Sequence, residues 1–273
     1  MSALAEIDGL VLVGAGNMGG AMLSGWVAGG LRREAITVID PNPANSIKNL
    51  LDSSGIRHVV APSEAIKAKI LVLAVKPQVM YAVLETVRPM VDENTLVISV
   101  AAGKTLAYFE ERLGHVPTVR TIPNTPAMIG RGMIGAYANE RVDETGRATA
   151  DALLAAVGDV EWVEKEADID AVTAVSGSGP AYVFHMVEVM AEAGRKLGLD
   201  ADLAMRLARG TVIGAGALLD RSSDDAGALR KNVTSPGGTT AAALEHLMAE
   251  DGIQPVFDRA LDAACKRSRE LAG

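Results

Sequence analysis

The feature that most constrains the fold is a series of short apolar segments that alternate with helical patterns through the first half of the chain. The clearest segments are residues 10–13, 36–39, 70–75 and 95–100. Such nearly continuous apolar runs are typical of parallel strands that helices cover on both faces. The alternation therefore predicts a doubly wound α/β domain. Further strands are expected at 118–122, 132–137 and 160–163, and helices at about 17–29 and 144–157.

The pattern changes after Glu164. From residue 166 to residue 271 we find helical periodicity and no convincing strand. The expected helices are residues 168–197, 201–219, 224–233, 239–249 and 253–270. We therefore expect two domains, an α/β domain of residues 1–165 and an all-helical domain of residues 166–273.

Two of these helices are apolar on nearly all sides. Residues 180–193 are interrupted near their centre only by His185, Glu188 and Glu192, and residues 211–219 are apolar after the first position. A helix that is apolar all round must be buried all round, which a small helical domain can hardly achieve alone. We therefore expect a homodimer through the helical domain, with a single well-packed bundle as the alternative. Three glycines would allow close helix approach at that interface: Gly210, Gly214 and Gly216.

Charge and cysteine content limit the classes of binding partner and the cellular compartment that we expect. The chain has 26 Lys and Arg against 34 Asp and Glu, a net charge of −8, which disfavours a nucleic-acid partner. One cysteine, Cys265, allows no internal disulfide and no zinc site, so we expect a reducing compartment and no metal. The first residues lack a basic signal region, and no apolar run approaches the ~18 residues of a membrane helix. We expect a cytoplasmic protein with no membrane partner.

A glycine-rich turn follows the first expected strand. Gly14-Ala15-Gly16-Asn17-Met18-Gly19 fits the pattern G-x-G-x-x-G and directly precedes the first helix. In this context Gly14 permits the tight turn, Gly16 lets a pyrophosphate approach the backbone, and Gly19 lets helix and strand pack closely. The pattern predicts that residues 1–165 form a Rossmann dinucleotide-binding domain.

The ends of the following strands should carry the rest of the dinucleotide site. Asp40 ends the second strand, where a carboxylate accepts from a ribose 2′-hydroxyl and repels a 2′-phosphate, which favours NADH. The next loop, residues 41–46, offers Asn and Ser but no Arg, and NADPH stays an alternative. Two further segments should line the nicotinamide half: Ala74-Val75-Lys76-Pro77 and Ala101-Ala102-Gly103. Lys76 could also be a simple surface charge.

Two segments of small residues interrupt the helical half, Ser176-Gly177-Ser178-Gly179-Pro180 and Thr234-Ser235-Pro236-Gly237-Gly238-Thr239-Thr240. In the second, consecutive backbone N–H groups from Gly237 to Thr240 open a helix. Backbone donors and the helix dipole together make a site for a small carboxylate. Ordinary helix capping by Ser235 or Thr239 is the alternative.

Several segments carry a family resemblance when they are taken together and in order. They are Gly14 to Gly19, Ala74 to Pro77, Ala101 to Gly103, Asn124-Thr125-Pro126, Ala174 to Tyr182 and Leu229 to Thr240. The whole chain resembles the pyrroline-5-carboxylate reductases. The resemblance implies reduction of 1-pyrroline-5-carboxylate to L-proline by NAD(P)H. It also implies a Rossmann domain followed by an all-α dimerisation domain, and a ring of dimers in many members.

The resemblance also implies roles for particular residues. It places cofactor contacts on Val13, Gly14, Ala15, Gly16, Asn17, Met18, Ala74, Val75, Lys76, Pro77, Ala101, Ala102, Gly103 and Glu166. It places substrate contacts on Ser176, Gly177, Ser178, Gly237, Gly238, Thr239 and Thr240. For Glu166 the sequence offers no independent physical argument. Thr239 stands where relatives often have Ala, and cofactor preference does not carry over because the ribose loop varies in the family.

The reaction needs a hydride on the imine carbon and a proton on the imine nitrogen. Neither substrate segment contains a His, Asp or Lys, and His185 is expected to be packed. The substrate either binds as the iminium ion or receives a proton from Thr240, relayed by water. Because a hydroxyl is a weak acid, Thr240 is the expected catalytic residue mainly as an orienting partner. A β-hydroxyacid dehydrogenase-like enzyme and a non-catalytic dinucleotide-sensing module are the alternative functions.

Overall fold

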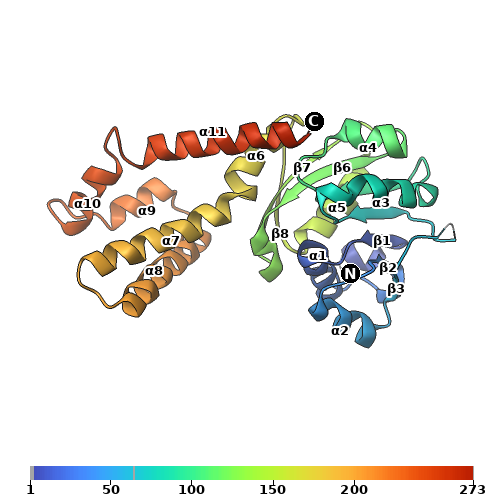
Figure 1. The fold of residues 1–273 in the computed structure, drawn as a ribbon, viewed down its shortest axis with the longest axis horizontal. Helices are drawn as coiled ribbons and strands as arrows, with labels where there is room; N and C mark the ends of the chain where they lie inside the picture. Colours follow the sequence, from blue (N-terminus) through green and yellow to red (C-terminus); the bar gives the residue numbers. More distant parts are fainter. Residues whose placement is uncertain (1–2, 64, 273) are drawn as a thin grey trace. The chain divides into compact units, whose positions relative to one another are not determined.

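The structure is a computed structural model, and it describes residues 3–63 and 65–272 (Figure 1). The chain divides into two compact units, Met1–Ser178 with Ala264–Gly273, and Gly179–Ala263. The first unit is α/β and the second is helical, so the fold class predicted from the sequence is confirmed.

The first unit is built on one sheet. Its eight strands among the described residues follow the order β3-β2-β1-β4-β5-β6-β7-β8. All neighbouring pairs are parallel except β6 and β7, which are antiparallel. The strands are β1 (Leu10–Val13), β2 (Ile36–Ile39), β3 (Arg57–Val59), β4 (Ile70–Leu73), β5 (Leu96–Ser99), β6 (Thr118–Pro123), β7 (Gly132–Ala138) and β8 (Gly158–Trp162). The order from β3 to β6 is that of a Rossmann fold, in which ligands bind beyond the carboxyl ends of the strands.

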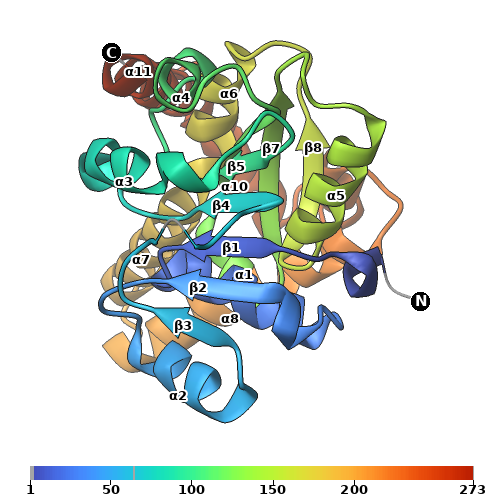
Figure 2. The same ribbon diagram turned by 90° about the vertical axis from the view of Figure 1, so that its right-hand side faces the viewer.

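Both faces of the sheet are buried, because successive side chains of a strand point to opposite sides. Leu10 and Leu12 belong to one apolar cluster, and Val11 and Val13 belong to the other. The first cluster is covered by α1 (Asn17–Ala28), α2 (Asn45–Ser54) and α5 (Glu144–Ala155), and the second by α3 (Met80–Val87) and α4 (Leu106–Leu113). Figure 2 shows α3 and α5 on opposite sides of the strands. The continuous apolar runs in the sequence follow from this double burial.

Single turns of 3-10 helix connect these elements. They are η1 (Ala3–Glu6), η2 (Arg33–Ala35), η3 (Pro77–Val79), η4 (Arg88–Met90) and η5 (Thr125–Ile129). After β8 the chain forms α6 (Asp168–Val172) and then a π-helical turn, η6 (Thr173–Gly177). The single helix that the sequence predicts from 168 to 197 is therefore divided at this turn.

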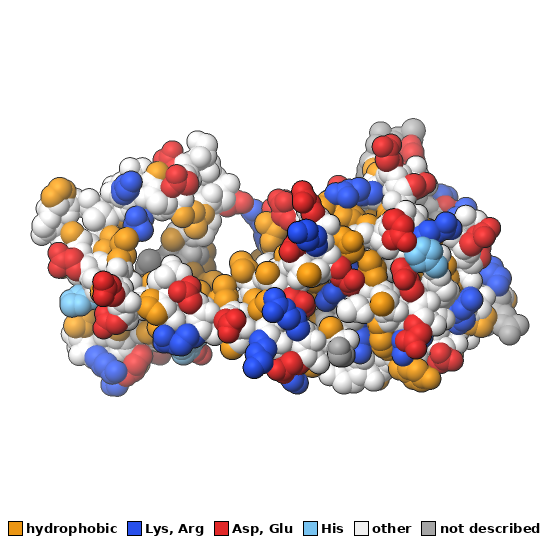
Figure 3. Space-filling model, turned by 90° about the horizontal axis from the view of Figure 1, so that it is seen from above, with side chains coloured by type: hydrophobic (Ala, Val, Ile, Leu, Met, Phe, Trp, Pro, Cys, Tyr) orange, Lys and Arg blue, Asp and Glu red, His pale blue; other side chains and the backbone are white. Residues whose placement is uncertain are grey.

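The second unit consists of helices. They are α7 (Gly179–Lys196), α8 (Ala201–Arg221), α9 (Ala226–Asn232), α10 (Thr239–Leu247) and the first part of α11 (Ile253–Ala272), whose residues from Ala264 onward belong to the first unit. Of the residues of α8, only Ala204 and Ala208 are buried within the chain. Its expected apolar stretch is open: Ile213 is 62% exposed, and a Cβ at Gly214 would meet no atom within 4 Å. Orange side chains at the surface of this unit are visible in Figure 3.

The domain boundary near Glu166 stays a prediction. The division into compact units falls at Ser178 instead, because α6 and η6 pack against the sheet. Gly135 on β7 shows how close that packing is, since a Cβ there would lie 2.4 Å from Cγ1 of Val172.

Candidate active site

The glycine turn after β1 has the geometry that its sequence indicates. Gly14 adopts a φ of 92°, where a Cβ would lie 2.7 Å from the carbonyl oxygen of Ala74. A Cβ at Gly19 would lie 2.0 Å from the carbonyl oxygen of Gly14, so this position requires glycine for close packing. Gly16 differs from both, because a Cβ there would meet nothing within 4 Å. The backbone at Gly16 is therefore open at the amino end of α1, where a dinucleotide pyrophosphate would fit.

Asp40 lies directly after β2 and fixes the neighbouring loops. Its Oδ2 accepts a hydrogen bond from the Ala15 N–H at 2.6 Å, and its Oδ1 accepts from the Asn42 N–H at 2.7 Å. The carboxylate thus joins the glycine turn to the loop where a ribose would be recognised. Lys48 Nζ lies 3.3 Å from Asn42 Oδ1. The loop contains no Arg, and the structure places the side chain of this lysine beside it.

The segments after β4 and β5 lie at the same edge of the sheet as the glycine turn. Ala74 donates its N–H to the carbonyl oxygen of Val13 at 2.8 Å, whereas Lys76 is exposed. In the second segment Ala101 is buried, and Gly103 adopts a φ of 68°. A Cβ at Gly103 would lie 2.8 Å from the Cβ of Leu271, so this glycine also makes room for the end of α11.

Glu166 belongs to a charged network beside that edge. Its Oε1 accepts from the Leu106 N–H at 2.7 Å and from Nη1 of Arg120 at 2.9 Å. Arg120 on β6 is only 2% exposed, and its Nη2 lies 3.8 Å from Oδ1 of Asp170. Ser268 of α11 donates to the same Oδ1 at 2.7 Å. The network places Glu166 at the start of α4, just after the 101–103 segment. This position gives a physical reason to expect Glu166 near the cofactor, a reason that the sequence alone did not offer.

Sequence reasoning missed Arg120, although a signal was present. A single arginine stands inside the strand Thr118–Pro123, whose other residues are apolar or small and polar. Because a charged side chain is almost never fully buried unless it is paired, such a position indicates a carboxylate partner elsewhere in the chain.

The two expected substrate segments belong to different units. Residues 176–178 are in the first unit, in and directly after η6, and the Ser178 N–H donates to the Thr173 carbonyl oxygen at 2.9 Å. Residues 237–240 are in the second unit, at the start of α10.

The start of α10 leaves backbone donors open. Gly237 adopts a φ of 69°, and Gly238 is the N-cap residue, with no side-chain capping bond. The capping role considered for Ser235 or Thr239 is therefore not what the structure shows. The Gly238 N–H donates to the Ser235 carbonyl oxygen at 3.0 Å, so it closes a turn. The N–H groups of the first helical turn after it, at Thr239, Thr240 and Ala241, point out of the helix end, as at any helix N-terminus.

His185 was expected to be packed, and within this chain that is wrong. Its side chain is 73% exposed, and its Nδ1 lies 3.0 Å from Glu188 Oε2 one turn along α7. The apolar helix around it is likewise uncovered in a single chain, so there is no core for the ring to enter.

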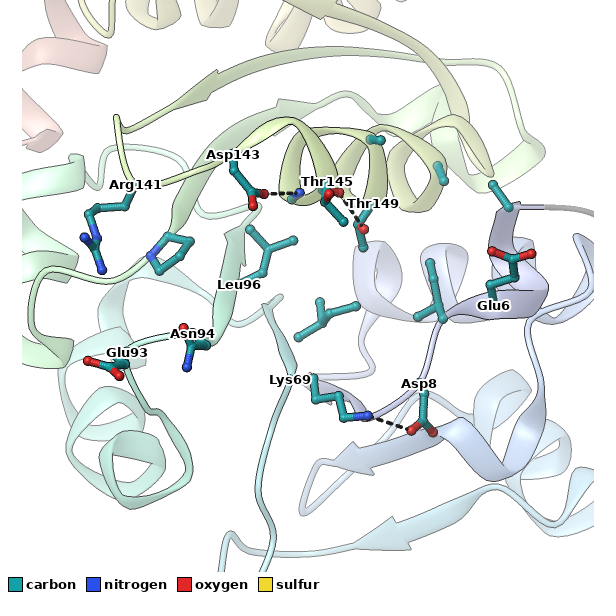
Figure 4. A pocket seen from close by; sticks show the side chains of 17 residues that line it. Glu6, Asp8, Lys69, Glu93, Asn94, Leu96, Arg141, Asp143, Thr145 and Thr149 are labelled. Carbon is teal, nitrogen blue, oxygen red and sulfur yellow. Dashed lines mark hydrogen bonds and ion pairs between the residues drawn. The ribbon is translucent and has the colours of Figure 1, made fainter.

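One cavity of the first unit lies away from these residues. It measures about 790 Å³ and is lined by the segments that precede β1, β4 and β5, at the amino ends of the strands, and by the first part of α5 (Figure 4). There Lys69 donates to Asp8 Oδ2 at 3.0 Å, and this hydrogen bond lowers the pKa of Asp8. A smaller pocket of about 160 Å³ lies beside the glycine turn, between α1 and the loop after β2, with Gly16 and Met128 in its lining.

The sheet order, the open glycine turn and the acidic residue after β2 together define a dinucleotide-binding protein of the Rossmann class with an appended helical unit. Among the described residues, no three His, Cys, Asp or Glu side chains gather in a way that could hold a metal ion. Likewise, none of the described helices is both long enough and apolar enough to cross a membrane.

Comparison with known proteins identifies the family. Residues 166–271 match the family model described as pyrroline-5-carboxylate reductase dimerisation, and residues 10–103 match NADP oxidoreductase coenzyme F420-dependent. The chain is 42% identical over 265 residues to a pyrroline-5-carboxylate reductase of Pseudomonas aeruginosa, covering 96% of each. It therefore belongs to the pyrroline-5-carboxylate reductase family.

Solved structures agree with this assignment. A pyrroline-5-carboxylate reductase of Coxiella burnetii is 34% identical with a TM-score of 0.90, covering 98% of this chain and 100% of that one. The enzyme of Plasmodium falciparum, solved with NADP bound, is 29% identical with a TM-score of 0.81, covering 98% of this chain and 99% of that one.

Proposed function

We propose that this chain reduces 1-pyrroline-5-carboxylate to L-proline with NADH or NADPH, the last step of proline biosynthesis. The family membership supports the reaction. The observation that carries the proposal is the start of α10, where a glycine caps the helix without a side chain and leaves the first backbone donors open.

The dinucleotide would bind along the carboxyl ends of β1, β2, β4 and β5. Residues 13–18 would hold the pyrophosphate, because Gly16 is open and the amino end of α1 attracts an anion. Residues 74–77 and 101–103 would contact the nicotinamide half, beside Glu166. When bound, the reduced nicotinamide supplies the hydride.

The substrate carboxylate would bind at the backbone N–H groups that begin α10. This part of the proposal assigns the open N–H groups of Thr239 and Thr240 to the carboxylate, with Gly237 and Gly238 forming the turn that exposes them. Ser176, Gly177 and Ser178 are the further contacts. Charge-assisted hydrogen bonds to backbone donors hold an anion without a basic side chain, which fits a chain of net charge −8.

The Thr240 hydroxyl would orient the ring nitrogen. A neutral hydroxyl is too weak an acid to protonate the imine efficiently alone, so its contribution is mainly positioning. The proton arrives either with the substrate as iminium or through water beside this hydroxyl.

The residues around the loop after β2 support binding of either cofactor. Asp40 favours a 2′-hydroxyl, whereas Lys48 brings a positive charge to within hydrogen-bond distance of Asn42 in the same loop. We propose NADH as the preferred cofactor, with NADPH accepted.

We further propose that two copies of the chain pair through their helical units. The exposed apolar side chains of α8 and the three glycines without neighbours, Gly210, Gly214 and Gly216, support such an interface. A ring of dimers and a cytoplasmic location stay predictions.

One assay tests the function. NADH and NADPH oxidation is followed at saturating 1-pyrroline-5-carboxylate, beside NAD⁺ reduction with a 3-hydroxy acid. We expect oxidation of both reduced cofactors with the imine and no reaction with the hydroxy acid. Absence of oxidation with the imine would refute the proposal.

A further inference from the structure

Asn124 lies directly after β6, in the segment Asn124-Thr125-Pro126 that contributes to the family resemblance. Neither the resemblance nor the proposed function assigns it a role. Its side chain is buried, with 9% exposure, and it joins two elements. Its Oδ1 accepts from the Met133 N–H of β7 at 2.9 Å, and its Nδ2 donates to the carbonyl oxygen of Ser176 at 3.2 Å. Asn124 therefore ties η6 to the end of the β6–β7 pair, and α6 lies against the same strands in Figure 1.

The chain itself explains why the Ser176 carbonyl needs this partner. In a regular α-helix a carbonyl accepts from the N–H four residues later, and that residue is Pro180, which has no N–H. A carbonyl without a partner would be costly in a partly buried turn. The amide of Asn124 supplies the donor that proline removes.

The hydroxyl of Ser176 is held by the same group of residues. It lies 3.3 Å from Asn124 Nδ2, from which it accepts, and it donates to the Met133 carbonyl oxygen at 3.3 Å. Both functions of the hydroxyl are thus engaged inside the first unit. The residue after it, Gly177, packs on β6, since a Cβ there would lie 3.1 Å from Cγ2 of Ile122.

We propose that Asn124 is a positioning residue for the substrate segment, acting through Ser176. Its amide donor holds η6 in the π-helical form, a form that often marks functional sites. Ser176 then serves as the anchor of the segment and not as a direct contact. Of the three residues proposed above, Gly177 and Ser178 are left to face the substrate. This inference rests on the proposed function, because it assigns the residue to the substrate half of that site and not to the cofactor half.

The same strand pair provides a matched control at its opposite end. Asn139 follows β7 and is 5% exposed. Its Oδ1 accepts from the Thr118 N–H at 3.1 Å, and its Nδ2 donates to the Val116 carbonyl oxygen at 2.9 Å and to Glu110 Oε1 at 3.2 Å. An Asn→Asp change at either position keeps an acceptor oxygen and removes the amide donor. Because Glu110 adds repulsion at position 139, N139D should disturb the fold at least as much as N124D.

The test compares N124D and N139D with the wild-type chain. For N124D we expect a rise of at least tenfold in KM for 1-pyrroline-5-carboxylate, with KM for the cofactor within twofold, since one buried donor is lost. N139D should leave both KM values within twofold. Equal KM values for the imine in the two variants would overturn the inference.

Amide hydrogen exchange of residues 173–178 gives a readout that does not depend on activity. We expect exchange there to be at least tenfold faster in N124D and unchanged in N139D, and unchanged exchange in N124D would overturn the inference. If N124D does not fold, Ser176→Ala replaces it. This variant loses the hydrogen bonds of the Ser176 hydroxyl and keeps the one from Asn124 to the carbonyl oxygen at position 176, so amide exchange of residues 173–178 should rise about threefold. An unaltered exchange rate would count against the inference. Failure of the wild-type chain to oxidise NAD(P)H with the imine would instead refute the proposed function, and the exchange result would still decide the role of Asn124.

Discussion

Gly16 and Gly19 lie three residues apart in one turn, yet the structure predicts opposite consequences for the same substitution. At Gly16 an added Cβ meets no atom within 4 Å, and the backbone, at φ −74° and ψ −152°, is open to alanine. At Gly19 the added Cβ would lie 2.0 Å from the carbonyl oxygen of Gly14. Gly16→Ala should therefore impair cofactor binding, and Gly19→Ala should impair folding.

The magnitudes follow from these contacts. Alanine is a poorer N-cap than glycine, which costs up to about 1 kcal/mol, but Gly→Ala also restricts the unfolded chain and recovers about 0.4–1 kcal/mol. Gly16→Ala should thus leave stability nearly unchanged. Gly19→Ala overpacks a backbone atom that cannot rotate away, at a cost of about 3 kcal/mol or more. At roughly 2–4 °C per kcal/mol, Tm of this variant should fall by about 6–12 °C.

Cofactor affinity should show the reverse order. The Cβ of Gly16→Ala occupies the space through which a pyrophosphate reaches the backbone. Loss of one charge-assisted hydrogen bond, about 1.5–3 kcal/mol, corresponds to a rise of roughly 10- to 150-fold in Kd for NADH. The assay is NADH fluorescence titration beside thermal unfolding of the cofactor-free chain, followed by circular dichroism. A Gly16→Ala variant that bound NADH with wild-type affinity, or that lost as much Tm as Gly19→Ala, would refute the reasoning.

Three further predictions concern the substrate, the ribose and the interface. Thr240→Ala should lower turnover by roughly 10- to 100-fold with KM for the cofactor little changed. The control is Thr86→Ala, which replaces an exposed threonine on α3. Wild-type turnover in Thr240→Ala would refute the role of this hydroxyl. Asp40→Asn removes the charge that repels a 2′-phosphate, so the ratio of kcat/KM for NADPH to that for NADH should rise several-fold, and an unchanged ratio would count against Asp40 as the ribose residue. Ile213 is 62% exposed in the single chain, and Ile213→Glu should shift the dimer toward monomer in light scattering. Val60 is 66% exposed on the first unit, and Val60→Glu should leave the dimer intact. Equal masses for the two variants would contradict an interface on α8.

The elements that sequence predicted best are those with burial on both faces. The apolar runs that became β1, β2, β4 and β5 needed no knowledge of their neighbours, because each residue is buried whichever way it points. The strand β3 was missed for the opposite reason. Arg57-His58-Val59 is short, polar and at the edge of the sheet, and it is a strand only because it pairs with β2.

Helix α4 was also missed, although its signals were local. Thr105 caps it by accepting from the Tyr108 N–H, and Leu106, Phe109 and Leu113 form a buried stripe at helical spacing. These signals are local, so the sequence alone is sufficient to predict this helix.

The residues of the candidate site also fall into those that local sequence predicts and those that only the fold reveals. The glycine turn could be predicted because each glycine answers a local constraint of the backbone. Arg120 and Asn124 could not be assigned partners, because Glu166 lies 46 residues from Arg120 and Ser176 lies 52 residues from Asn124. Their types alone indicated only that buried polar groups need partners; the fold determines which ones.

The helical unit makes the strongest case that part of the fold depends on a second chain. Within one chain, α9 and α10 bury no residue, and α8 buries only two alanines. Yet α8 carries Ile213, Leu218 and Leu219, each more than half exposed. Several large apolar side chains exposed on one helix are typical of an interaction surface. Glycine at positions 210, 214 and 216 would be unfavourable in an exposed helix, because it costs about 1 kcal/mol relative to alanine and gains no packing in return. Among the described residues, no neighbour needs the space that these glycines leave. This supports the proposal that a partner copy approaches α8 closely.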